Sequence, residues 1–293
     1  MGDTTSGDAV TVNGAGTYDS VDCETFEVNG TGKVSGDVLA TTATVNGTAK
    51  VGGRVDVGTL DVDGTAKVEG GVRGEAVGVD GTAKFRSDVT ADRVEIDGTT
   101  KVGGDASGSE FTADGTLKVG GNLDGHDVEV DGTAKVSGSV VAADAFFDGT
   151  VKVGGLTDVT DLGVDGTGKF GDVNADVFAA SGTLRAGEVR ARSFEFAVGD
   201  RSEADSVRAT DASVHRGSGG SSLGRKLLGR DDPVFEVGTV EAETAALDAV
   251  DAETVVADSV TLGPDADVGV VYTDDLEDDP EATVGSVRPR EDY

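Results

Sequence analysis

The chain has 293 residues, with 56 acidic and 24 basic side chains and a formal net charge of −32. This charge repels phosphate groups, which argues against nucleic acid and anionic membrane as general partners. The single cysteine excludes an internal disulfide, and no apolar run approaches the roughly 20 residues of a membrane-spanning helix. No signal peptide is visible, so the sequence predicts a cytoplasmic protein. Aromatic residues make up only 4% of the chain, which predicts a slim core of Val and Ala.

The N-terminal segment, residues 1–9, has no apolar pattern, and we expect it to be flexible. The first inward-facing pair is Val10 and Val12, followed by Tyr18 and Val21. Cys23 falls on an inward position for a small residue, so we interpret it as a core side chain rather than a nucleophile.

A repeat of about 17 residues organises the next segment, residues 10–215, and its clearest mark is Asn/Asp-Gly-Thr. One register maintained over about 150 residues is typical of a repeat architecture. Eight successive intervals of identical length separate the glycines Gly30, Gly47, Gly64, Gly81, Gly98, Gly115, Gly132, Gly149 and Gly166.

Apolar side chains recur within each repeat at steps of 2, 4, 2, 3, 2 and 4 along the chain. A step of two keeps both side chains on one face of a strand, and we interpret the longer steps as corners. Three strands and three corners per repeat predict an all-β, three-faced parallel β-solenoid. We expect the repeat glycine to supply a positive φ at its corner. The alternative is a meander of β-hairpins, which would need a second hairpin turn midway through every repeat.

Outward positions of the repeat form columns of Thr and Lys. We interpret the lysines as a solvated face balanced by a column of corner aspartates, and the alternative is a lateral contact with acidic faces of neighbouring filaments. Ice-binding solenoids need two threonine columns in a Thr-x-Thr pattern. Ice binding is disfavoured here because lysine occupies the second of these columns. The basic column comprises Lys33, Lys50, Lys67, Lys84, Lys101, Lys118, Lys135, Lys152, Lys169 and Arg185.

Residues 216–233 interrupt the pattern with a Gly/Ser-rich segment that contains Arg225, Lys226 and Arg230. We expect a solubilising loop, and the alternative is a docking site for an acidic partner or membrane head groups. Apolar periodicity returns over residues 234–272 with shorter coils, of about 15 residues. An acidic tail, residues 273–293, completes the predicted organisation.

No constellation in the chain is typical of an enzyme. Its two histidines, His126 and His215, each lie alone, and no motif of a catalytic, cofactor-binding or metal-binding site is present. We therefore predict a protein that is not an enzyme, has no cofactor and takes no small-molecule substrate.

The repeated NGT/DGT-x-K-V coils from Val10 to Val214, together with the closing stretch VTLGPDADVGVVY, resemble the bactofilins, which are polymer-forming cytoskeletal proteins. The acidic, Lys-poor composition is similar to that of their haloarchaeal homologues, the halofilins. The resemblance implies a right-handed solenoid, filaments formed without nucleotide by end-to-end stacking of coils, and a role in cell shape. The chain departs from bacterial members in its longer, interrupted array and its lack of a membrane-targeting segment at the start.

The sequence therefore predicts a cytoskeletal scaffold whose main partner is another copy of itself. Other cytoskeletal or membrane-associated proteins, and a position at the inner face of the membrane, remain open. The alternative is a solenoid scaffold or adhesion module that does not polymerise. The predicted interface comprises Val10, Val12, Tyr18, Val21, Val260, Leu262, Val268 and Val270. The predicted structural ladder comprises Gly47, Gly64, Gly81, Gly98, Gly115 and Gly132 with Lys50, Lys67, Lys84, Lys101, Lys118 and Lys135.

Overall fold

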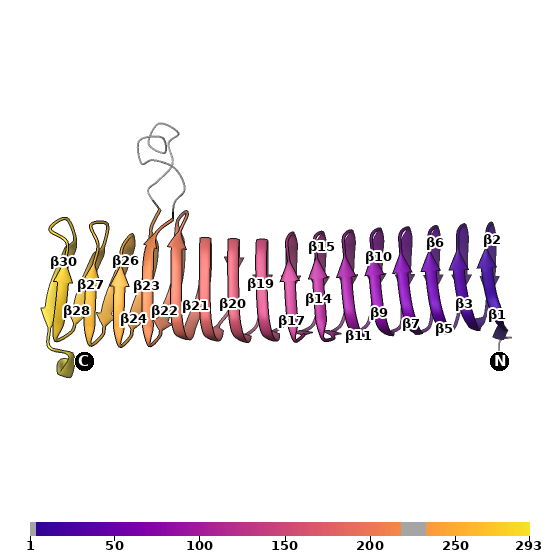
Figure 1. Cartoon of the computed structure of the whole chain (residues 1–293), viewed down its shortest axis with the longest axis horizontal. Coiled ribbons are helices and arrows are strands. Elements are labelled where there is room, and N and C mark those ends of the chain that lie inside the picture. The colour runs from indigo at the N-terminus through magenta and orange to yellow at the C-terminus, as the bar shows by residue number, and fades with distance from the viewer. Residues whose placement is uncertain (1–3, 218–232) are drawn as a thin grey trace, which may run out of the picture. The chain divides into compact units, whose positions relative to one another are not determined.

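The computed structural model describes residues 4–217 and 233–293, and these residues form a parallel β-solenoid with about 17 residues per coil (Figure 1). The predicted fold class is confirmed, and the antiparallel meander is excluded. The chain divides into two compact units, Met1–Ala143 and Asp144–Tyr293, which are described separately. The described residues contain no α-helix, and only one short 3-10 helix, η1 (Arg290–Asp292).

In the first unit most coils contribute a short strand and a longer strand, and in two coils the longer strand is divided into two pieces. The strands are β1 (Thr4–Val12), β2 (Ala15–Tyr18), β3 (Ser20–Val28), β4 (Thr31–Val34), β5 (Val38–Val45), β6 (Thr48–Val51), β7 (Val55–Val62), β8 (Thr65–Val68), β9 (Val72–Val79), β10 (Thr82–Phe85), β11 (Val89–Ile96), β12 (Thr99–Val102), β13 (Ala106–Ser107), β14 (Glu110–Ala113), β15 (Thr116–Val119), β16 (Leu123–Asp124), β17 (Asp127–Val130) and β18 (Thr133–Val136). Strand β19 (Val140–Val153) begins in this unit and ends in the next.

The three faces of the coil are visible in the pairing of β11. Its first residues pair with β13 and its last residues with β14, so the two halves of this strand lie on different faces. The third face is formed by the short strands. For example, β6 pairs with β8, and Thr48 of β6 lies opposite Thr65 of β8. Each partner lies one repeat further along the chain, as the sequence period predicts.

Alternation along these strands places the core. In β6 and β8, Ala49, Val51, Ala66 and Val68 are buried, while the Thr and Lys side chains between them point outward. Because each coil lies on the next in register, inward side chains form continuous apolar columns, and their burial provides the main stabilisation of the solenoid.

The repeat glycines are needed for a reason other than the expected one. Among the described residues, Gly149, Gly166 and Gly182 have positive φ values of 123°, 124° and 110°, whereas the ladder glycines from Gly47 to Gly132 do not. A Cβ on Gly64 would lie only 2.0 Å from the carbonyl oxygen of Gly47 in the preceding coil. The corners stack too closely for any side chain, so the expectation of positive φ at the ladder glycines is wrong.

A second corner carries a ladder that the sequence reading missed. The Asp88 carboxylate accepts a hydrogen bond of 2.9 Å from the backbone N–H of Asp105, and the Asp105 carboxylate accepts one of 2.7 Å from Asn122. A Cβ on Gly104 would lie 1.9 Å from the Asp88 oxygen. The Gly-Asp pairs at this corner could have indicated it, because the glycine makes room for the carboxylate of the coil before.

The second unit keeps the parallel stacking and changes the coil length. Its strands after β19 are β20 (Thr157–Lys169), β21 (Val173–Val198), β22 (Ser202–Arg208), β23 (Asp211–Arg216), β24 (Phe235–Glu241), β25 (Thr244–Leu247), β26 (Val250–Val256), β27 (Ser259–Leu262), β28 (Asp267–Tyr272), β29 (Asp275–Asp278) and β30 (Thr283–Arg288). Phe235 of β24 lies opposite Val250 of β26, which confirms the shorter coil predicted for this part of the chain.

The core of the second unit is richer in aromatic rings than the composition predicts. Phe170, Phe178, Phe194, Phe196 and Phe235 are buried in one cluster, with ring centroids 5.2 to 6.5 Å apart. The expected slim core of Val and Ala therefore describes the first unit better than the second.

Both predicted outer boundaries of the solenoid are corrected. Strand β1 starts at Thr4 and pairs with β3, so the described part of the expected flexible segment 1–9, residues 4–9, already belongs to a coil. Strands β29 and β30 pair with β27 and β28, so the solenoid continues through most of the expected tail 273–293. Most of the predicted basic loop lies outside the described residues, and Ser202 pairs directly with Phe235 beyond it.

Candidate functional site: two solenoid edges and a charged column

The N-terminal edge of the first unit consists of β1 and β2. Among the described residues, β1 pairs only with β3 and β2 only with β4, so the outer backbone groups of both strands lack a strand partner. Val10 and Val12 are nevertheless 8% and 3% exposed. The half-buried Tyr18 ring lies beside Gly16, where a Cβ would be 2.9 Å from Tyr18 Cε2 and 3.0 Å from Val12 Cγ1.

The C-terminal edge of the second unit consists of β29 and β30. Val240, Val255, Val271 and Val287 occupy one inward column of successive coils. The first three are at most 1% exposed, whereas Val287 is 52% exposed. Its neighbours Leu276 and Val284 are half-buried on the same edge. The apolar core is therefore open to solvent at β29 and β30.

The last residues of the chain dock on the side wall of the second unit. The Tyr293 hydroxyl donates a hydrogen bond of 3.1 Å to the Glu241 carboxylate, and its ring packs against Tyr272 with centroids 5.1 Å apart. Arg290 forms an ion pair with Asp258, and its backbone N–H donates to Asp274 over 3.3 Å. These contacts hold the chain end along earlier coils instead of across β30.

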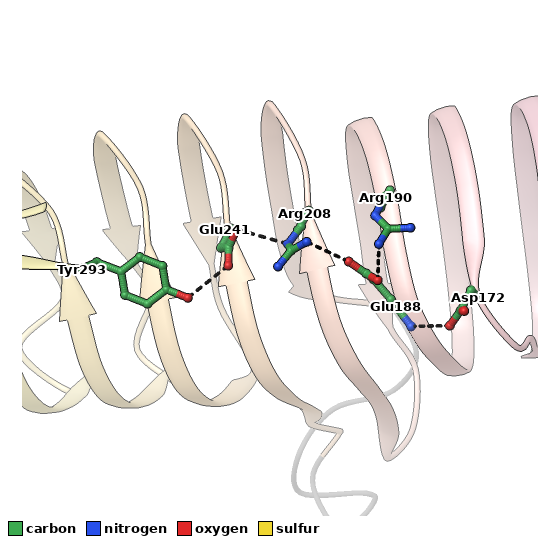
Figure 2. A network of polar contacts seen from close by, with 6 residues as sticks. All are labelled: Asp172, Glu188, Arg190, Arg208, Glu241 and Tyr293. Atoms are coloured by element: carbon green, nitrogen blue, oxygen red, sulfur yellow. Dashed lines mark hydrogen bonds and ion pairs between the residues drawn. The ribbon is translucent and has the colours of Figure 1, made fainter. Parts of the chain in front are cut away.

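Figure 2 shows that this docking site continues into a row of ion pairs. Arg208 lies 3.1 Å from both Glu241 and Glu188, and Glu188 also pairs with Arg190. The hydrogen bond to Glu241 raises the pKa of the Tyr293 hydroxyl, with a smaller contribution from partial burial. Tyr293 therefore stays protonated and remains a hydrogen-bond donor near neutral pH.

The predicted interface residues do not all lie at an edge. Val10, Val12 and Tyr18 belong to the first coil, whereas Val21 is fully buried under Thr5 of β1. Val260 and Leu262 are covered by β29, and Val268 is covered by β30.

Val270 is half-exposed because Val271, not Val270, points into the core. The prediction that the last coil ends at residue 272 was wrong. The C-terminal edge is formed by Leu276, Val284 and Val287, and not by the predicted Val260, Leu262, Val268 and Val270. Sequence reasoning missed them because Asp and Glu dominate residues 273–282 and the apolar signal there is sparse.

The predicted lysine ladder is present in the first unit. Seven lysines lie opposite one another in successive strands, and we call them the lysine column. They are Lys33, Lys50, Lys67, Lys84, Lys101, Lys118 and Lys135. Six of the seven are exposed, and Lys67 is half-buried beside Glu69 at 2.6 Å. The contacts to Lys67 and Arg86 lower the pKa of Glu69.

Cys23, which the sequence places at an inward position, is half-buried. Burial raises the pKa of the Cys23 thiol, whose sulfur donates to the Thr25 carbonyl oxygen at 3.2 Å. Within residues 4–217 and 233–293, no group of three His, Cys, Asp or Glu side chains is placed to hold a metal ion. In the same part of the chain, no helix is long and apolar enough to cross a membrane. No protein-family model, curated protein or solved structure matches the chain.

Proposed function

We propose that this protein is a bactofilin-like cytoskeletal scaffold whose copies join end to end into filaments without nucleotide. In this proposal the C-terminal edge of one copy receives the N-terminal edge of another, and the parallel stacking continues across the junction. Such filaments would act in the cytoplasm and support cell shape.

The observation that supports the proposal most is the exposure of Val287. An inward column that is closed over three coils becomes half-exposed at its last member, and β30 carries a row of backbone groups without a strand partner among the described residues. An open sheet edge with an apolar end readily pairs with another chain unless it is covered or carries a protecting charge. The neighbouring Arg288 side chain lies over the Tyr272 ring of the preceding coil, with its guanidinium carbon 5.8 Å from the ring centroid.

The docking of Tyr293 supports the same proposal. A C-terminal segment of a solenoid can serve as a cap when it folds over the last coil. Here the segment after β30 returns along the side wall toward Glu241 and Asp258, which leaves the C-terminal edge accessible.

A second candidate function is a scaffold that does not polymerise, and the N-terminal edge favours it. Val10 and Val12 are already buried within a single chain, and the Tyr18 ring covers part of the first coil. An interface at this edge would gain little apolar burial and would depend mainly on backbone hydrogen bonds.

The test is Val287→Lys, which places a charge on the open end of the core. The control is Thr261→Lys, which adds the same charge at an exposed, outward position of β27. Both variants should keep the far-UV circular dichroism spectrum of a β protein. We expect electron microscopy and sedimentation without nucleotide to show filaments for the natural chain and for Thr261→Lys, and short particles for Val287→Lys.

Two results would overturn the proposal. One is a natural chain that stays monomeric over the whole concentration range, which would support the non-polymerising scaffold. The other is unchanged assembly of folded Val287→Lys, which would show that the C-terminal edge is not the contact.

A further inference from the structure

The outward column that contains the lysines changes its sign within the second unit. Lys169 lies opposite Arg185, Arg185 opposite Glu203, and Glu203 opposite Glu236. The same position is then occupied by Asp251 and Asp267. We call Glu203, Glu236, Asp251 and Asp267 the acidic column. It continues the outward position that Lys169 and Arg185 occupy in the same unit.

The lysine column is poorly compensated inside its own unit. Among the described residues, Lys67 is its only member in an ion pair, and that partner is Glu69. Stacked strands place neighbouring rungs about 4.8 Å apart, so adjacent ammonium groups repel one another. A shallow groove of about 300 Å³ follows this column and is lined by Lys33, Lys50, Lys67 and Glu69 among others.

The acidic column is only partly compensated inside its own unit. Glu203 and Glu236 have ion-pair partners in Arg185 and Arg201, while Asp251 and Asp267 are exposed. In the part of the chain that the structure describes, neither aspartate forms an ion pair. A groove of about 300 Å³ also follows this column, between Glu203, Glu236 and Asp251.

We propose that the lysine column of one copy docks against the acidic column of a second copy, side by side. The two columns suit each other because both repeat at the spacing of stacked parallel strands, so one contact in register brings the following rungs into register as well. This lateral contact goes beyond end-to-end assembly, since it uses neither open edge.

A second copy fits the lysine column better than a foreign polyanion. The whole molecule carries a net charge of −32, which repels a nucleic acid before it reaches a narrow basic strip. A second copy carries the same overall charge, but its acidic column has a strand repeat that matches the lysines rung by rung. Salt at about 0.1 M already screens the general repulsion beyond about 10 Å, whereas it weakens close ion pairs much less.

The experiment uses the full chain with Val287→Lys, which removes the open-end contact and isolates lateral association. One variant adds Lys84→Glu, Lys101→Glu and Lys118→Glu, none of which has an ion-pair partner among the described residues. A control matched in net charge reverses three positive charges outside the lysine column, at Arg54, Arg73 and Arg93. Arg54 and Arg93 form ion pairs with Asp37 and Glu110, so the far-UV circular dichroism spectrum of this control must first match that of its parent.

The second variant reverses the other side of the contact with Glu203→Lys, Asp251→Lys and Asp267→Lys. A combined chain carries both sets of three changes and therefore has the same net charge as its parent. Sedimentation velocity over a range of concentrations gives the dissociation constant of self-association for each chain, alone and in mixtures.

We expect each charge-reversed variant to weaken self-association at least about tenfold, because three rungs become repulsive. Association should return when the two variants are mixed, and also in the combined chain. The arginine control should associate like the parent. Raising the salt concentration from about 0.1 M to about 1 M should weaken association of the parent, because the Debye length falls from about 10 Å to about 3 Å.

Three results would overturn this inference. The first is a parent that stays monomeric at every concentration and salt level. The second is unchanged association of the lysine variant, or failure of the combined chain to recover. The third is binding of heparin that is lost with the three lysines while self-association stays unchanged, which would assign the column to a polyanion. Failure of end-to-end assembly would appear separately, as an absence of filaments for the natural chain and for Thr261→Lys, and the lateral series does not depend on that result.

Discussion

The aromatic cluster of the second unit allows a quantitative prediction for Phe178→Ala. The Phe178 side chain is fully buried, with its ring centroid 6.3 Å from that of Phe170 and 5.5 Å from that of Phe194. Both pairs are edge-to-face, at interplanar angles of 82° and 77°. The substitution removes one ring of the cluster and its two aromatic contacts.

The expected cost follows from burial and from the two ring pairs. Truncation of a buried Phe to Ala destabilises a protein by about 3–5 kcal/mol. Each edge-to-face pair contributes about 0.5–1.5 kcal/mol beyond its buried area, which places Phe178 in the upper half of that range. A loss of this size is a large fraction of the roughly 5–15 kcal/mol that stabilises a typical domain. Because coils interact mainly with their neighbours, the loss should appear first in the second unit.

Phe146→Ala is the matched control, because the Phe146 side chain is 52% exposed. Urea unfolding followed by circular dichroism measures both free energies of unfolding, and hydrogen exchange identifies the coils that open first. We expect a loss of under about 1 kcal/mol for Phe146→Ala. Equal losses for the two variants, or a loss for Phe178→Ala as small as that expected for the control, would refute the reasoning from burial and ring contacts.

Two further predictions concern the first unit. Gly64→Ala should destabilise it by about 1–3 kcal/mol or more, because the new Cβ meets the backbone of the preceding coil. Gly14→Ala is the control: no atom lies within 4 Å of its Cβ, so the melting temperature should stay nearly unchanged. Partial burial, and then the charges of Asp63 and Asp80, raise the pKa of Asp61. The ionised carboxylate therefore destabilises the folded state above its folded pKa, and this penalty disappears below the unfolded pKa. Asp61→Asn should raise the melting temperature slightly at about pH 7 and give no gain at about pH 3; equal gains at both would contradict this explanation.

Much of the first unit could be predicted from the sequence because its information is local and periodic. The constant repeat spacing sets which residues lie one above another, and the steps of two within a repeat assign Val51 and Val68 to the core and Lys50 to the surface. A solenoid repeats one local rule, so a pattern within a single coil is enough to predict the register of all coils that share it.

Other features needed the tertiary structure because they depend on contacts between coils. The close approach of the Gly47 carbonyl to Gly64 cannot be distinguished from a positive φ by sequence alone. The side-wall docking of Tyr293 on Glu241 joins residues 52 positions apart, without any local pattern.

The charged column shows the same division most clearly. Its lysines were predictable because the repeat spacing stays constant along the first unit. Beyond Arg185 the spacing between aligned residues changes from each coil to the next, so the alignment with Glu203, Glu236, Asp251 and Asp267 is not visible in a periodic reading. Local alternation thus determined which side chains face outward, whereas the stacking of unequal coils decided which charges share a column.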